Sequence, residues 1–162
     1  MIVIPANCWQ TVVERFTDAS GLSENVAFLD GIPLGPEPVH GGVVTTVTLP
    51  ETDRQRGGWW VDTRQMSAAG QHLRVSRLVR LAQVHTHPGP WTQHSELDDA
   101  LAYSQRPGTV SIVLPTHGLT HPGLTDAGVH LRGENGWREL RGEEIDRHIK
   151  VVPSVLDHRA TR

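Results

Sequence analysis

The stretch VHTHPGPWTQHSELDD, residues 84–99, constrains the fold more than any other part of the chain. It begins inside LVRLAQVHTH, residues 78–87, an apolar-rich run that predicts a strand stopped by Pro88. Ser95 is a good N-cap, so a helix is expected from there to about residue 104. The sequence therefore predicts a strand, a loop and a helix in immediate succession.

Residue types that bind metals lie at regular positions on this unit. His85 and His87 are two residues apart on the predicted strand, so both imidazoles leave the same face. Ser95 and Asp98 are three apart at the start of the predicted helix, so they also share a face. The strand and the helix can thus bring two imidazoles and one carboxylate to one point.

Such a ligand set is typical of one kind of metal site. Three N/O ligands with a fourth position open favour a catalytic Zn²⁺ site, whereas a structural site is closed by four protein ligands, usually with cysteines. The only cysteine, Cys8, is far away in the sequence. We therefore predict that His85, His87 and Asp98 bind Zn²⁺.

The chain is rich in histidine, with 10 in 162 residues, so accidental pairs need to be considered. In the alternative interpretation the segment is a histidine-rich surface loop before a capped helix, and Asp98 merely favours the positive helix N-terminus. We expect His94 to be exposed, with a supporting position behind the metal ligands as the alternative, and Asp99 to be a helix-start charge. His117 and His121 are also expected to be exposed, because their Gly/Pro-rich loop has no matching carboxylate motif.

Helices and strands mix along the rest of the chain. The clearest helical pattern lies at residues 7–18, where Trp9, Val12, Val13 and Phe16 form an amphipathic stripe. Further helices are expected at 62–74 and 143–150, strands at 25–30, 43–49, 109–114, 129–131 and 137–140, loops at 32–37 and 51–58, and an extended end at 151–155. The mixture predicts an α/β (α+β) class with a single mixed β-sheet flanked by helices. The length fits one domain spanning residues 1–162.

Composition excludes several function classes. A formal net charge of −3 gives no electrostatic case for nucleic acid or an anionic membrane. The sequence contains no run of about 18 apolar residues, so no membrane-spanning helix is predicted. The start, MIVIPANCW, lacks the basic region and the long apolar region of a secretory signal. A single cysteine suits a reducing compartment, so we expect a cytoplasmic protein.

The pattern resembles the metal motif of the JAMM family, also known as JAB or MPN+ domain metallopeptidases. Their signature is an upstream glutamate, then His-(Ser/Thr)-His-Pro, then Ser-x-x-Asp after a seven-residue spacer. The matching motif positions are His85, Thr86, His87, Pro88, Ser95 and Asp98. Glu24 in ENVAFLDG matches the upstream glutamate, which in the family begins a short apolar strand ending in glycine. The resemblance covers most of the chain but is sharp only at these residues.

The resemblance implies a fold and a reaction. The fold is a mixed sheet flanked by helices, similar to that of cytidine deaminases. Deaminase activity itself is excluded, because its signature needs a Pro-Cys-x-x-Cys pair. Family members cleave peptide or isopeptide bonds, most often after the C-terminal glycine of ubiquitin or a ubiquitin-like protein. In this mechanism zinc activates a water molecule, Glu24 is the general base, and Ser95 stabilises the oxyanion.

The partner remains open at this point. The small size resembles stand-alone prokaryotic members, which act on ubiquitin-like proteins or their conjugates, some beside activating and conjugating enzymes in antiviral defence. The same chemistry fits trimming of a sulfur-carrier protein. A non-catalytic MPN scaffold is the alternative of another class, although such scaffolds typically lack the ligands. A RadC-like protein has a similar motif but usually carries an added helix-hairpin-helix region.

Some individual residues also admit two interpretations. Glu14 is the rival to Glu24 as general base. Cys8 is a conceivable nucleophile, but a buried, inert thiol is favoured because no histidine is evidently held beside it. Trp59, Trp60 and Trp91 are either core residues or anchors for a protein partner.

Overall fold

The computed structural model describes residues 1–18, 24–35, 41–53 and 60–154. Within these ranges eight strands form one mixed sheet in the order β10-β1-β3-β2-β6-β7-β8-β9. The strands are β1 Ile2–Pro5, β2 Val26–Pro33, β3 Gly42–Thr48, β6 Val79–Thr86, β7 Val110–Leu114, β8 Gly128–Gly133, β9 Gly136–Leu140 and β10 Ile149–Val152. A separate ribbon pairs β4 Thr52–Asp53 with β5 Trp60–Val61. The predicted mixed sheet is confirmed.

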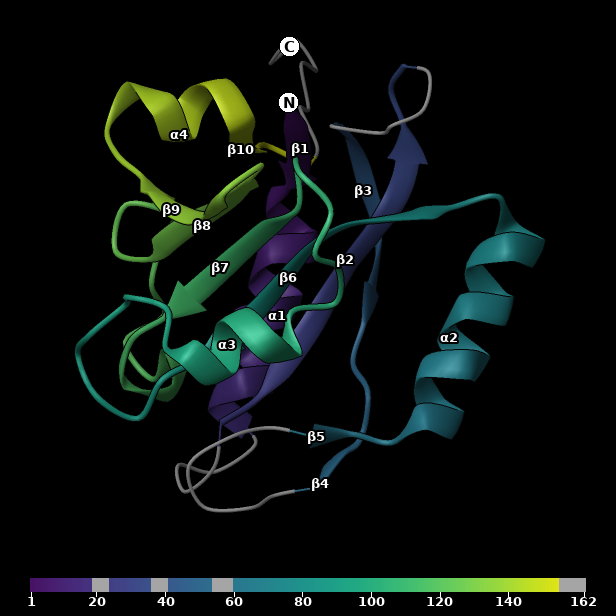
Figure 1. Cartoon of the computed structure of the whole chain (residues 1–162), viewed down its shortest axis with the longest axis horizontal. Coiled ribbons are helices and arrows are strands. Elements are labelled where there is room, and N and C mark those ends of the chain that lie inside the picture. The colour runs from purple at the N-terminus through teal and green to yellow at the C-terminus, as the bar shows by residue number, and fades with distance from the viewer. Residues whose placement is uncertain (19–23, 36–40, 54–59, 155–162) are drawn as a thin grey trace, which may run out of the picture.

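The helices lie on both faces of this sheet (Figure 1). They are α1 Ala6–Asp18, α2 Thr63–Ser76, α3 Glu96–Leu101 and α4 Glu143–His148, with a short 3-10 turn, η1, at Thr116–Gly118. In the view of Figure 1, α3 lies in front of the sheet and α1 behind it. No helix in the described part of the chain is long and apolar enough to cross a membrane.

The apolar stripe of α1 packs on the sheet as the sequence predicts. Trp9, Val12, Val13 and Phe16 are all buried and belong to the main core cluster. That cluster also contains residues from all eight strands of the main sheet. Burial of this face by the hydrophobic effect is therefore the chief source of stability for the sheet.

The central strand β6 divides its side chains between the two faces. Ala82 and Val84 belong to the core that α1 covers, whereas Gln83 and His85 point to the opposite face. Parallel pairing with β7 sets Ser111 beside Gln83, and antiparallel pairing with β8 sets His130 beside Ser111. These four polar side chains are at most 4% exposed. The face that α3 covers is thus both buried and polar.

Two predicted boundaries are wrong because of tertiary contacts. Strand β2 continues to Pro33, although Gly31 was expected to end it. Gly31 lies at a register shift against β3, where a Cβ atom would come within 2.0 Å of the Val43 carbonyl oxygen. Glycine here permits a close approach of two strands and does not stop the strand.

Helix α3 ends at Leu101, earlier than the expected residue 104. Ala102 turns to an extended conformation, and the Tyr103 amide donates to the Gln83 side-chain oxygen at 2.9 Å. A tertiary hydrogen bond therefore replaces the next turn of helix.

The sequence also failed to predict β1 and β4. The four residues of β1 pair in parallel with β10 and β3, which are distant in sequence. The expected loop at 51–58 contains β4, and its residues 54–58, like Trp59, lie outside the described residues. The predicted hairpin is confirmed as β8 and β9, and the expected helix at 143–150 is α4 followed by β10.

Candidate metal centre

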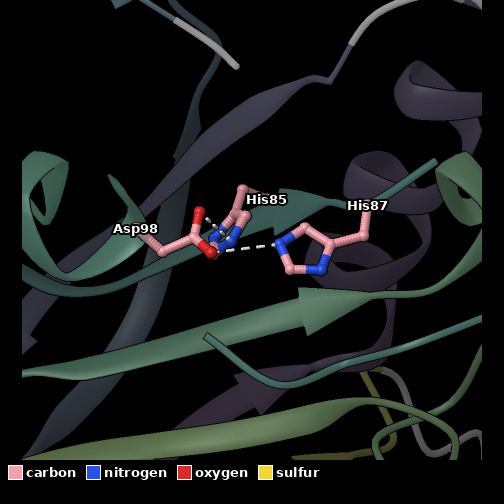
Figure 2. Close-up of side chains that lie close together, drawn as sticks. All are labelled: His85, His87 and Asp98. Carbon is pink, nitrogen blue, oxygen red and sulfur yellow. Dashed lines mark hydrogen bonds and ion pairs between the residues drawn. The ribbon is translucent and has the colours of Figure 1, made fainter. Parts of the chain in front are cut away.

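The strand, loop and helix of residues 84–99 bring the three predicted ligands together. His85 lies on β6, His87 follows the end of that strand, and Asp98 lies in the first turn of α3. One potential ligand atom from each residue lies within 4.8 Å of the other two. Figure 2 shows both imidazoles turned toward the Asp98 carboxylate. His85 Nε2 lies 3.1 Å from Asp98 Oδ1, and His87 Nε2 lies 3.2 Å from Asp98 Oδ2.

All three residues are buried: His85, His87 and Asp98 are 0%, 3% and 4% exposed. Buried charges need partners, so this cluster is costly unless its charges are matched. A buried carboxylate facing two imidazole nitrogens suits a divalent cation such as Zn²⁺. The residues present therefore fit the metal that the sequence motif implies.

The position of Asp98 is fixed by a capping box at the start of α3. The Ser95 hydroxyl oxygen accepts from the Asp98 amide at 3.2 Å. In return, Asp98 Oδ2 accepts from the Ser95 amide at 2.6 Å and from the Ser95 hydroxyl at 2.7 Å. The predicted N-cap is confirmed, and the same contacts hold the carboxylate toward the histidines.

The pKa values of both His87 and Asp98 are shifted from their usual ranges. Burial alone raises the pKa of Asp98, but hydrogen bonds from His85 and His87 outweigh it and hold the pKa well below its usual range. Burial alone lowers the pKa of His87, but the hydrogen bond and charge of Asp98 outweigh it, so the pKa is raised. The carboxylate is consequently ionised at neutral pH.

The second nitrogen of His87 shows how a cation fits. Nδ1 lies 3.3 Å from the Trp91 carbonyl oxygen, which can only accept, so Nδ1 carries a proton. The contact of Nε2 with the carboxylate of Asp98 needs a second proton on the ring. A metal ion held by His87 and Asp98 would remove the need for that second proton, and the Trp91 carbonyl would keep the ring oriented.

Glu24 lies beside the cluster, as predicted from the resemblance. Val26 pairs with His85, and Asn25 exchanges hydrogen bonds with Thr86. Continuing this register sets Glu24 opposite His87. Burial is the largest cause of a raised pKa at Glu24, and the Asp98 charge adds to it, while His87 and His85 oppose it.

The rival residues lie in different surroundings. Glu14 is exposed on α1, where its carboxylate accepts from the Gln10 amide at 2.6 Å. Cys8 is partly buried against the main core, and burial raises the pKa of its thiol. A raised pKa disfavours the thiolate, which is the nucleophilic form. The structure therefore places Glu24 beside the His85–His87–Asp98 cluster and leaves Glu14 exposed to solvent.

His94, which the sequence assigned to the surface, has a side chain only 6% exposed. Its ring lies 5.8 Å from that of His85, centroid to centroid. Burial, together with the neighbouring His130, lowers the pKa of His94 to about 4. Asp99 is also more than a helix-start charge, because it lies 2.8 Å from His94 Nδ1. The expected exposure of His94 was wrong, because a single loop histidine carries no periodicity that would reveal its burial. Asp99 does lie in the first turn of α3, as expected, and contacts His94 in addition.

His117 was also expected to be exposed but is partly buried in η1. Thr116 and His117 both have left-handed φ values, 48° and 56°, without being glycine. Their amides donate to the carbonyl oxygens of Gly89 and His87, at 2.8 and 2.7 Å. Backbone strain of this kind costs on the order of 1–3 kcal/mol per residue and often lies at functional sites. His121 is exposed, as expected.

Comparison with known proteins supplies the fold. No protein-family model and no curated protein sequence matches the chain. A JAB1/MPN domain protein from Archaeoglobus fulgidus superposes with a TM-score of 0.54 at 16% identity, covering 93% of this chain and 97% of that chain. This chain has the JAB1/MPN fold.

Two further solved structures resemble this JAB1/MPN-fold chain over all or nearly all of their lengths. A protein from Desulfitobacterium hafniense has a TM-score of 0.71 at 19% identity, with 100% of both chains covered. A protein from Salinibacter ruber has a TM-score of 0.58 at 16% identity, covering 100% of this chain and 95% of that chain. The α/β class with a mixed sheet and the JAB/MPN architecture predicted from the motif are both confirmed.

Proposed function

We propose that this protein is a zinc metallopeptidase of the JAMM type, with Zn²⁺ bound by His85, His87 and Asp98. The observation that carries the proposal is the convergence of these three buried side chains, with Glu24 beside them. The JAB1/MPN fold supports it independently. The reaction is hydrolysis of the peptide or isopeptide bond after the C-terminal glycine of a ubiquitin-like protein or its conjugates.

The residues divide the chemistry among them. A bound zinc ion lowers the pKa of a water molecule to about 7, which supplies a nucleophile near neutral pH. Glu24 accepts the proton of that water and returns it to the leaving amine. In the metal-free protein, burial of Glu24 raises the pKa of its carboxyl group.

Ser95 has a second task in this scheme. Its hydroxyl donates to Asp98 in the structure, so it must rotate to donate to the developing oxyanion. The Ser95 amide continues to hold Asp98 Oδ2 during that rotation. The capping contact through the backbone therefore frees the hydroxyl for catalysis.

The substrate tail is expected to bind beside Trp91. This indole is 50% exposed, and its ring centroid lies 6.1 Å from that of His87. It packs so closely on Gly89 that a Cβ atom there would lie within 1.6 Å of the ring. Strand β6 is paired on both sides, so a tail cannot add to β6 itself. A rigid aromatic side chain at the entrance favours a narrow tail of small residues.

The partner and its setting belong to the same proposal. We place the enzyme in the cytoplasm of a bacterium, beside a ubiquitin-like protein and its activating and conjugating enzymes. A sulfur-carrier protein is the other partner to be tested, because the bond cleaved and the residues used are the same.

Metal analysis combined with a cleavage assay tests the function. Wild-type protein should bind one Zn²⁺ per chain and cleave fusions that carry a C-terminal glycine tail. Glu24→Gln should keep the zinc and lose turnover on the order of a thousandfold, whereas Glu14→Gln should resemble wild type. His87→Ala should lose the metal. A metal-free active protein, or loss of activity in Glu14→Gln alone, would overturn the proposal.

A further inference from the structure

A chain of hydrogen bonds crosses the polar face of the sheet beneath α3. Asp99 Oδ1 accepts from His94 Nδ1 at 2.8 Å, because a carboxylate cannot donate. The other nitrogen of a neutral His94 ring then accepts from the Ser111 hydroxyl at 3.0 Å. Ser111 in turn accepts from the Gln83 amide nitrogen at 3.0 Å, and the Gln83 oxygen accepts from the Tyr103 amide. Every donor in this chain has one acceptor.

The chain ties both ends of α3 to the strands beneath it. Asp99 lies in the first turn of α3 beside the ligand Asp98, and Tyr103 follows the last turn. Gln83 lies two residues before the ligand His85 on β6. The hydrogen bonds therefore connect the element that holds the carboxylate with the strand that holds the imidazole.

Two aromatic side chains pack against the His94 ring. Its ring stacks on His130 with centroids 4.0 Å apart and an angle of 21° between the planes. His130 is fixed by a hydrogen bond of 2.8 Å between Nε2 and the Thr92 carbonyl oxygen. The ring of Trp137 lies 5.0 Å from His94 on a tilted plane. Little freedom remains for the His94 ring to turn.

Helix α3 has few other means of keeping its position. It has six residues, and its only buried residue is Asp98. A helix this short is not stable by itself, and most helices are positioned by an apolar face that packs on a core. Leu101, packed on Val26 and Phe28, supplies only a partial contact of that kind.

We propose that His94 is a positioning residue of the metal centre, which fixes Asp98 relative to His85 through its hydrogen bonds to Asp99 and Ser111. The inference rests on the proposed metal binding and goes beyond it by naming the device that sets the ligand geometry. Outer contacts of this kind typically change metal affinity by about 10- to 100-fold.

Asp99 offers a matched pair of variants, because its side chain is 46% exposed and tolerates change. Asp99→Asn keeps an oxygen acceptor for His94 Nδ1, while Asp99→Ala removes it. Both variants remove the same charge beside the metal ligand. The difference between them therefore isolates the hydrogen bond.

We expect the Zn²⁺ dissociation constant of Asp99→Ala to exceed that of Asp99→Asn by about tenfold, at the low end of the outer-contact range. His94→Phe, which keeps the stacking but loses both hydrogen bonds, should weaken Zn²⁺ binding by up to a hundredfold. The visible spectrum of bound Co²⁺ should change in His94→Phe and Asp99→Ala but not in Asp99→Asn. Thermal unfolding of the metal-free forms is the control for a merely structural role. Without metal, Asp99→Ala and Asp99→Asn should unfold at similar temperatures.

Equal Zn²⁺ affinity and equal Co²⁺ spectra across Asp99→Ala, Asp99→Asn and wild type would overturn the positioning role and leave the proposed function intact. Wild-type protein that binds no Zn²⁺ would instead overturn the proposed function and the positioning role together. A drop in affinity that matches the drop in unfolding temperature of the metal-free variants would also contradict the proposal.

Discussion

The two faces of the central sheet are both buried, but one is apolar and the other is polar. On the α1 side, β6 contributes Ala82 and Val84 to an apolar core. On the α3 side, the same strand contributes Gln83 and His85, and both are fully buried. The apolar face is stabilised by non-directional burial and tolerates small shifts. The polar face is stable only when each donor meets its acceptor, so it fixes positions.

This difference separates stability from chemistry within one strand. Changes on the α1 face should act on the free energy of unfolding, while changes on the α3 face should act first on metal binding and turnover. The predictions below test that division, from the largest expected effect to the smallest.

The first prediction concerns Phe16, which is 2% exposed in the α1 core. Phe16→Ala should lower the free energy of unfolding by about 3–5 kcal/mol, through lost burial and a cavity. Zinc affinity of the remaining folded protein should be unchanged. Urea unfolding and zinc titration measure the two quantities. The division fails if Phe16→Ala weakens zinc binding as strongly as Ser111→Ala on the polar face.

The second prediction sharpens the role of Ser95. Ser95→Ala should lower kcat by roughly a hundredfold through loss of one oxyanion donor. It should also lower stability by about 1 kcal/mol through loss of the helix cap. Ser95→Thr keeps a hydroxyl and serves as the control. Steady-state kinetics at full zinc occupancy decide the matter, since a fall in kcat that follows zinc loss alone would contradict a direct role.

The third prediction tests the entrance of the site. Gly89→Ala leaves the indole of Trp91 chemically intact but forces it to move, because the new Cβ atom and the ring cannot share the space. KM for a tailed substrate should rise about tenfold, equivalent to ~1.4 kcal/mol, with kcat retained. Trp91→Ala should give a similar change. Unaltered KM in both variants would exclude Trp91 from substrate binding.

The smallest predicted effect is a pH dependence that changes sign with metal. In the metal-free protein the raised pKa of His87 stabilises the fold fully below the unfolded value of about 6.5, and this stability is lost as pH rises through the folded pKa. Zinc binds the deprotonated ring, so its stabilisation grows with pH. Unfolding temperatures from pH 6 to 8, with a chelator and with excess zinc, should therefore slope in opposite directions. Parallel slopes would refute His87 as a ligand.

Sequence reasoning found the candidate ligands because they lie on one continuous segment. His85 and His87 share a strand face by period two, and Asp98 follows a clear N-cap. Glu24 is distant in sequence, and only the resemblance to a known motif connected it with the histidines. Pattern and resemblance together thus predicted the groups that converge at the candidate site.

The supporting residues could not be predicted in the same way. His94 lies in a loop, and Ser111, whose hydroxyl donates to it, follows 17 residues later on a separate strand. Strand β1 has four residues whose pairing partners lie near residues 42 and 149. Neither the burial of a loop histidine nor the pairing of a four-residue strand has a local signal, because both depend on tertiary structure.

The left-handed turn at Thr116 and His117 has a consequence for the order in which the site is assembled. The carbonyl oxygens of His87 and Gly89 receive their donors from residues about thirty positions later, after α3 has crossed over and β7 has paired with β6. All three predicted ligands lie within residues 85–98. A peptide of that segment alone would lack the Thr116 and His117 amides that donate to its carbonyl oxygens. During synthesis the predicted ligands leave the ribosome before the residues that fix their positions. The metal centre is therefore a late product of folding, although its sequence motif is local.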